Sequence, residues 1–133
     1  MHAVVEATMW YRVAGVAGAL AVMAGAFGAH GLREILSEQL MNTWNTAALY
    51  HLVHSLALLA VAAHPRRPAV AGWLFVAGIT LFSGSLYAMG LANAVTGESY
   101  RLLGAITPIG GVCFIAGWLT LAFWRTHKRP EDA

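Results

Sequence analysis

The sequence predicts an all-α fold, an integral membrane four-helix bundle, and three observations support this prediction. Hydrophobic residues make up 59% of the 133 residues and charged residues only 11%, against roughly a quarter in ordinary soluble domains. The apolar residues form four long runs, each comparable to the roughly 20 residues that a helix needs to cross the hydrocarbon core. The basic residues stand at the ends of these runs. We therefore expect a single domain whose solvent and first partner is the lipid bilayer.

The four expected spans begin and end at residues typical of a membrane interface. Trp10, Tyr11 and Arg12 precede the first span, and two prolines flank paired arginines at residues 65–68, between the second span and the third. Trp73 lies near the start of the third span. The expected spans are residues 13–29, 44–63, 69–93 and 102–124.

A secretory signal peptide is an alternative interpretation of the first apolar run, which follows Arg12 and ends among small residues. Two features favour a span that stays in the protein. Glu6 offsets the positive charge of Arg12, and glycines continue through Gly25, Gly28 and Gly31, as expected of a packing face. We therefore treat this run as the first helix of the bundle.

The distribution of Lys and Arg predicts the orientation of the chain. Six of the eight lie on one side of the expected bundle, and only Arg33 and Arg101 lie on the other. The positive-inside rule places the richer side in the cytoplasm, so we expect a multi-pass protein of the cell (inner) membrane with both termini cytoplasmic. The basic residues form no continuous patch, so nucleic acid is not expected as a partner. The six residues are Arg12, Arg66, Arg67, Arg125, Lys128 and Arg129.

The connection between the first two spans, residues 30–43, is amphipathic. Leu32, Ile35, Leu36 and Leu40 share one face of a helix there, and charged residues lie largely on the other. This pattern predicts a short interfacial helix between spans one and two. An amphipathic cover lying across the outer ends of the spans is the alternative.

Small residues recur at helical spacing in the first and fourth runs. Close packing through such residues supplies much of the association of helices in lipid, so they predict a tight bundle. Contact with a second copy or with another membrane protein through one of these faces is the alternative. The residues are Ala14, Gly18, Ala21, Gly25 and Gly28 in the first run, and Gly104, Gly110, Gly111 and Gly117 in the fourth.

Polar side chains concentrate in the outer half of the expected bundle, where they need protein partners because lipid supplies none. Pro108 adds to this need, because its ring displaces the carbonyl of Gly104 from its helical hydrogen bond. The candidate site residues are His30, His51, His54, Ser83, Ser85, Tyr87 and Thr107.

Three interpretations of this polar cluster stand side by side. The first is structural: hydrogen bonds between helices, worth about 0.6 to 2 kcal/mol each, fix the register of the spans. The second is an outer-facing site that binds or transfers a small molecule, an ion or a proton through titratable histidines. The third is a metal or haem site built on His30, His51 and His54.

An enzyme is not expected, because no carboxylate lies within an expected span and no nucleophile motif is present. Neither a metal nor another cofactor is assigned. The leading expectation is a membrane protein of the accessory or scaffold type, and the outer-facing binding or transfer site is the alternative.

Four motifs follow one another along the chain: GAFGAHGL at residues 25–32, Tyr50 with HSLA at 54–57, FSGSLY at 82–87, and TPIGG at 107–111, the last followed by Phe114, Gly117 and Trp118. Together they resemble the YgdD-like family of small membrane proteins, a domain of unknown function whose animal relatives include transmembrane protein 256. The resemblance covers residues 13–124 and implies a four-span protein without an established activity. The family pattern matches His30 and His54 but not His51, which argues against a three-histidine metal site.

Overall fold

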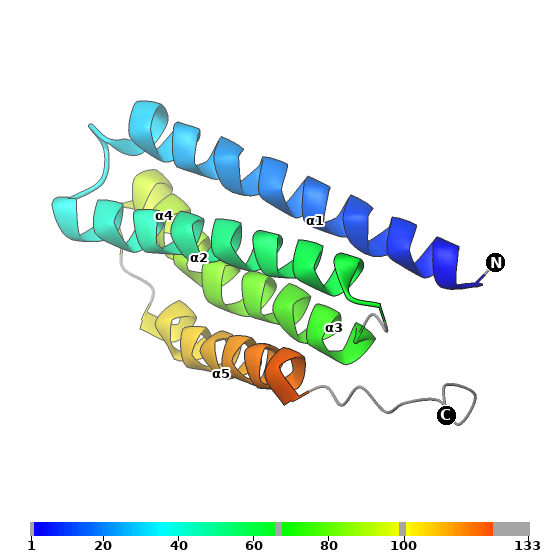
Figure 1. Ribbon diagram of the computed structural model, residues 1–133. Coiled ribbons are helices and arrows are strands. Elements are labelled where there is room, and N and C mark those ends of the chain that lie inside the picture. The colour runs from blue at the N-terminus through cyan, green and yellow to red at the C-terminus, as the bar shows by residue number, and fades with distance from the viewer. Residues whose placement is uncertain (1, 66–67, 99–100, 124–133) are drawn as a thin grey trace, which may run out of the picture.

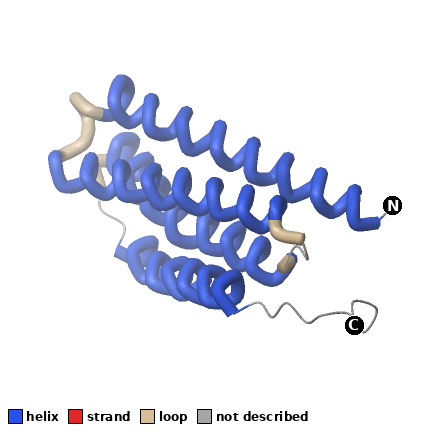
Figure 2. The backbone as a smooth tube through the Cα atoms, in the orientation of Figure 1, coloured by secondary structure: helices blue, strands red, loops and turns tan. Residues whose placement is uncertain are grey.

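The computed structural model describes residues 2–65, 68–98 and 101–123, with side chains from Thr8 onward except that of Arg101. These residues form four long helical rods that run alternately in opposite directions and are joined by short connections (Figures 1 and 2). Two of the rods contain one π-helical stretch each. In chain order the elements are α1 (His2–Phe27), η1 (Gly28–Leu32), α2 (Glu38–Ala63), α3 (Ala69–Gly78), η2 (Ile79–Ser83), α4 (Gly84–Thr96) and α5 (Arg101–Phe123).

Four stretches of the described chain are long and apolar enough to cross a membrane, which confirms the predicted all-α membrane bundle. They extend beyond several of the expected limits, most clearly at the start of the second span. The expected last residue of the fourth span, Trp124, lies outside the described residues, as do five of the six basic residues used to predict orientation. The stretches are Thr8–Leu32, Glu38–Ala63, Ala69–Thr96 and Leu102–Phe123.

The bundle has two central rods and two outer ones. α1 packs mainly along α2, and α5 packs mainly along the continuous rod α3–η2–α4 (Figure 1). Only 17% of the apolar stretch of α1 and of α5 is buried, against 44% of that of α2. The outer helices therefore present most of their side chains to the surroundings of the bundle.

The predicted interfacial helix between the first two spans is wrong. Residues 30–43 are divided instead between the end of the first rod and the start of α2. The first rod ends at Leu32, whose carbonyl accepts hydrogen bonds from the N–H groups of Ile35 and Leu36. The hydroxyl of Ser37 then accepts a hydrogen bond from the N–H of Leu40 and caps α2. Because this cap starts a new helix, the apolar side chains never form one continuous amphipathic face.

Aromatic rings packed on glycines hold the rods together. In the core around Trp10, Phe75 and Phe114, a side chain on Gly72 would overlap the indole ring of Trp10, and one on Gly117 would overlap the ring of Phe75. At the other end of the bundle Trp44 packs with Leu32 and Leu36 and lies against Gly28 and Gly90. Glycines thus act here mainly as seats for large rings.

The predicted small-residue face of α1 is only partly used. Ala14 and Ala21 are buried, and Gly18 faces Ser55 of α2. Gly15 and Gly25, by contrast, have open space where a side chain would be. The prediction was therefore right for the part of α1 that turns toward α2 and wrong for Gly25.

The central rod α3–η2–α4 widens at its midpoint into the π-helical stretch η2. The N–H of Gly84 bonds to the carbonyl of Ile79, five residues earlier, which is the π-helical pattern. α5 approaches this stretch so closely at Gly110 that a methyl group there would overlap the backbone of Phe82. η2 therefore fixes the distance between the central rod and α5.

Candidate functional site

His51 and His54 lie further from the outer end of their helix than expected, whereas Thr107 stands five residues after Leu102, where the fourth span was expected to begin. His51 stands 13 residues after Glu38, the first residue of α2, which places it roughly 20 Å from that end and close to the midpoint of the helix. Ser83 lies at the midpoint of the third span. His30, in contrast, is exposed near the end of the first rod. The predicted place in the outer half does not hold for the two histidines of α2, because α2 begins six residues before the expected start at residue 44, whereas Ser85, Tyr87 and Thr107 lie in the outer halves of their stretches.

His54 is held by contacts from its own helix α2, from α3 and from α5, and it borders a groove of about 560 Å³. Its Nδ1 lies 2.6 Å from the carbonyl oxygen of Tyr50, and its Nε2 accepts a hydrogen bond of 3.1 Å from the indole N–H of Trp118. Its ring stacks on Phe114 with 3.5 Å between the ring centres and 9° between the planes. Phe75 packs nearby, with its ring centre 5.7 Å away.

These contacts define the chemical state of His54. A carbonyl oxygen only accepts and an indole N–H only donates, so Nδ1 carries the proton and Nε2 is the acceptor. The ring is therefore neutral and both of its nitrogens are occupied. In this arrangement His54 joins α2 to α5 and has no nitrogen left for a metal, a ligand or an additional proton.

His51 has a different environment, although it lies only three residues earlier on α2. Its Nδ1 is 3.4 Å from the phenolic oxygen of Tyr87, a long contact at the limit of a hydrogen bond. The Tyr87 ring also packs against Trp44, with 4.7 Å between the ring centres. His51 is only 7% exposed, yet it contributes to the floor of a surface groove.

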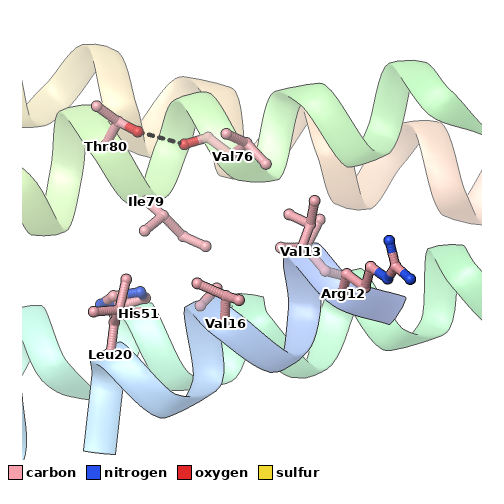
Figure 3. A pocket seen from close by; sticks show the side chains of 10 residues that line it. Arg12, Val13, Val16, Leu20, His51, Val76, Ile79 and Thr80 are labelled. Carbon is pink, nitrogen blue, oxygen red and sulfur yellow. Dashed lines mark hydrogen bonds between the residues drawn. The ribbon is translucent and has the colours of Figure 1, made fainter. Parts of the chain in front are cut away.

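This groove, which we call the α1–α3 groove, lies between α1 on one side and α3 and η2 on the other (Figure 3). It has a volume of about 430 Å³ and is open along one side. Val13, Val16 and Ile79 point into it from the two walls, Arg12 stands at one end and His51 lies at its floor (Figure 3). Its surface is almost wholly apolar.

Of the remaining polar side chains, Ser85 and Thr107 connect two helices, whereas Ser83 makes no hydrogen bond among the described residues. The hydroxyls of Ser85 and Thr107 are 2.7 Å apart, across α4 and α5. Ser85 donates to the carbonyl of Phe82 at 2.9 Å, so Thr107 is the donor to Ser85. The hydroxyl of Ser83 is buried and has no hydrogen-bond partner among the described residues. The Ser85–Thr107 pair therefore fixes the register of α4 against α5 beside the π-helical stretch.

The three histidines do not converge. Among the residues that the structure describes, no three His, Cys, Asp or Glu side chains come together as a metal would require. His30 is exposed near the end of the first rod, and His54 already uses both of its ring nitrogens. The geometry thus gives no support to the metal and haem interpretation.

Sequence reasoning missed the tryptophans that complete these contacts. The indole N–H of Trp44 donates to the carbonyl of Ala24 at 2.8 Å and joins α2 to α1. The indole N–H of Trp118 donates to Nε2 of His54 and joins α5 to α2. Trp44 stands at the expected start of a span, where tryptophan is usually an interface anchor, and this concealed its role. The signal in the sequence was Gly28, whose missing side chain leaves room for the indole ring of Trp44.

Comparison with known proteins gives the chain a family. Residues 24–111, which include all seven candidate residues, match the family described as a protein of unknown function, DUF423. A UPF0382 membrane protein of Staphylococcus epidermidis is 47% identical over 106 residues, or 77% of this chain and 82% of the relative. The UPF0382 membrane protein YwdK of Bacillus subtilis is 43% identical over 108 residues, or 77% and 83%. One of Schizosaccharomyces pombe is 42% identical over 118 residues, or 86% and 98%.

No solved structure matches the chain significantly. The relatives are described as membrane proteins, in agreement with the four apolar helices of the structure. The expectation of a small membrane protein family without a known activity is confirmed. The chain belongs to the DUF423 family of membrane proteins of unknown function.

Proposed function

We propose that this protein is a non-enzymatic accessory or scaffold-type component of the membrane, which acts by associating with another membrane protein. One observation carries the proposal: most of the interior polar side chains are engaged in joining helices or in bonds to their own backbone. His54 uses both ring nitrogens in this way, and Ser85 and Thr107 pair across two helices. Groups committed to hydrogen bonds inside the bundle are poor candidates for catalysis.

The outer helices supply the surface for such an association. Val112 and Ile115 on α5 are 65% and 62% exposed, and α1 carries a comparable apolar side. In a bilayer these side chains contact lipid or a neighbouring helix, and association between helices depends on close packing there. A rigid bundle with two uncovered outer helices is suited to binding a partner laterally.

The orientation is part of the proposal. By the positive-inside rule, the six Lys and Arg on the side of the termini favour a cytoplasmic location for both ends of the chain. A fluorescent reporter fused after Asp132 is expected to report a cytoplasmic location. An extracytoplasmic signal from this fusion, with a cytoplasmic signal from a fusion in the connection between α4 and α5, would reverse the orientation.

The accessory role is tested by photo-crosslinking in the native membrane. A crosslinking amino acid at Val112 of α5 is expected to give one discrete adduct with another membrane protein. The same probe at the buried position Leu58 is the matched control and should give none. Adducts with lipid alone at every exposed position of α1 and α5 would contradict the proposal. The adduct must also form when the captured partner, and not this protein, carries the probe.

A second candidate function rests on His51. Among the described residues its ring makes one hydrogen-bond contact, which is long, and it lies at the floor of a groove near the midpoint of α2. A histidine in this position suits the transfer of a proton or the binding of a small polar molecule. This differs from the outer-facing site expected from the sequence, because His30 and His54 take no part in it.

Proteoliposomes separate this candidate from the first. Under an imposed pH gradient, proton transfer through His51 would give a flux above that of protein-free vesicles. His51→Gln would abolish this flux and His30→Gln would leave it unchanged, since His30 lies exposed near the end of the first rod. A wild-type flux equal to that of empty vesicles rejects proton transfer.

A further inference from the structure

The α1–α3 groove combines an apolar surface with a single positive charge at one end. Val13, Val16 and Leu20 of α1 line one wall, and Ile79 lies opposite them (Figure 3). The hydroxyl of Thr80, which also borders the groove, donates to the carbonyl of Val76 at 2.9 Å. The groove therefore offers few free polar groups along its length.

Arg12 has no described carboxylate near it. The acidic side chains that the structure describes are Glu34 and Glu98, in connections between helices, and Glu38, the first residue of α2, and all three lie at the opposite end of the bundle. Arg12 is exposed and borders the groove, and none of the described carboxylates competes with an anion for its guanidinium. A guanidinium matches the geometry of a phosphate and binds it through paired N–H groups.

The dimensions fit a chain that enters from the end of the membrane-spanning segment. From Arg12 to Leu20 is eight residues of helix, or roughly 12 Å, so the groove reaches from the start of the apolar stretch of α1 toward its middle. Its volume of about 430 Å³ lies within the range of small-molecule sites. An occupant therefore needs an apolar tail along the groove and an anionic group beside Arg12.

The positive charge of the sequence segments that follow α2 and α5 also favours an anionic occupant. Five further Lys and Arg stand in the sequence segments that follow α2 and α5, the two helices that run toward the Arg12 end. Basic residues at a membrane surface attract anionic lipids. A neutral lipid or a helix of a second copy would make no use of this charge.

We propose that the α1–α3 groove binds one acyl chain of an anionic phospholipid, whose phosphate is held by Arg12. The bilayer supplies this lipid directly through the open side of the groove. The inference is independent of the accessory role, because lipid binding requires no protein partner. It also assigns to Arg12 a role beyond that of a membrane anchor.

Native mass spectrometry of the full chain tests the headgroup. The protein in detergent is titrated with dioleoyl phosphatidylglycerol or with dioleoyl phosphatidylcholine, which share their acyl chains. We expect the anionic lipid to be retained about fivefold more, and Arg12→Gln to remove this preference. Arg33→Gln is the matched control, since Arg33 is exposed at the opposite end. Equal retention of the two lipids, or an equal effect of both substitutions, would overturn the proposal.

A second pair of variants tests the groove. Val16 borders the groove and is 61% exposed, whereas Val22 is 62% exposed on the same helix and does not border it. Val16→Phe is expected to reduce lipid retention several-fold without changing the melting temperature of the lipid-free protein. Val22→Phe should leave retention unchanged. If both phenylalanines act alike, or if Val16→Phe instead breaks a dimer of the lipid-free protein, the groove does not hold an acyl chain.

Discussion

His51 and His54 lie one helical turn apart on α2, yet they occupy opposite situations. His54 is stacked on Phe114 and bonded at both ring nitrogens, on the side of α2 that faces α5. His51 makes one long contact with Tyr87 and lies at the floor of the open α1–α3 groove. The difference arises from the rotation of α2, which turns one histidine toward aromatic rings and the other toward the aliphatic walls of the α1–α3 groove.

The two sides of the bundle thus differ in how firmly they hold their histidine and in the kind of side chain that lines them. The side between α2, η2 and α5 is lined by aromatic rings, and a groove of about 560 Å³ opens there beside His54: Phe82 stacks on Tyr50, and Phe114 packs between Phe82 and His54. The side between α1 and α3 keeps an apolar groove. Hydrogen bonds and ring stacking fix His54 on the first side, whereas His51 on the second side makes one long contact.

The largest expected effect comes from removing the His54 ring. His54→Leu should lower the free energy of unfolding by about 2 to 3 kcal/mol, because two hydrogen bonds are lost and the indole N–H of Trp118 loses its acceptor. The matched control, His51→Leu, should cost less than about 1 kcal/mol. Reversible unfolding in mixed detergent micelles measures both. If both substitutions lower the free energy of unfolding by the same amount, His54 is not held more firmly than His51.

A close approach of backbones gives the next largest effect. Gly110→Ala should destabilise the bundle by about 2 kcal/mol, because its methyl group would overlap the backbone of Phe82 in η2. At the neighbouring Gly111 a methyl group would be 3.9 Å from the Phe82 ring, an ordinary contact. Gly111→Ala should therefore change stability by less than about 0.5 kcal/mol. The melting temperatures of the two variants measure this difference. A Gly110→Ala variant with an unchanged melting temperature would refute the close approach.

The hydroxyl pair of Ser85 and Thr107 should contribute less. A double-mutant cycle with Ser85→Ala and Thr107→Val is expected to give a coupling free energy of about 0.6 kcal/mol, typical of hydrogen bonds between helices in membranes. Thr120 supplies a control, because its hydroxyl bonds only to the carbonyl of Ala116 on its own helix. Coupling between Ser85→Ala and Thr120→Val should be zero within error. A zero coupling for the first pair would remove its role in register.

The smallest effect is expected on the exposed side of α1. Gly15→Ala should leave stability unchanged within about 0.5 kcal/mol, since nothing lies within 4 Å of the added methyl group. The mass of the protein–detergent complex, measured by light scattering, should also stay the same. A clear fall in mass would mean that Gly15 contacts a second copy, which would revive the dimer interpretation of the small residues on α1.

The sequence predicts most of the residues of the site but not how their side chains are arranged. The types were informative: His51, His54 and Tyr87 stand out because polar groups in apolar runs require partners. The partners themselves were not deducible, since Trp118 lies 64 residues after His54 and their contact depends on how two helices are rotated. The depth of the cluster was misjudged for a local reason. Ser37 caps α2 earlier than the apolar run suggested, so every position on that helix lies further from the first helical residue than expected.

The sequence by itself determined the class of protein and the number of spans. Both depend on the length and polarity of local segments, which must match the thickness of the bilayer whatever their neighbours are. Only the tertiary structure decided which polar groups pair, which glycines seat aromatic rings, and where a groove remains. These depend on the rotation and spacing of helices that are far apart in the chain. Close packing settles that arrangement collectively, so no single segment encodes it.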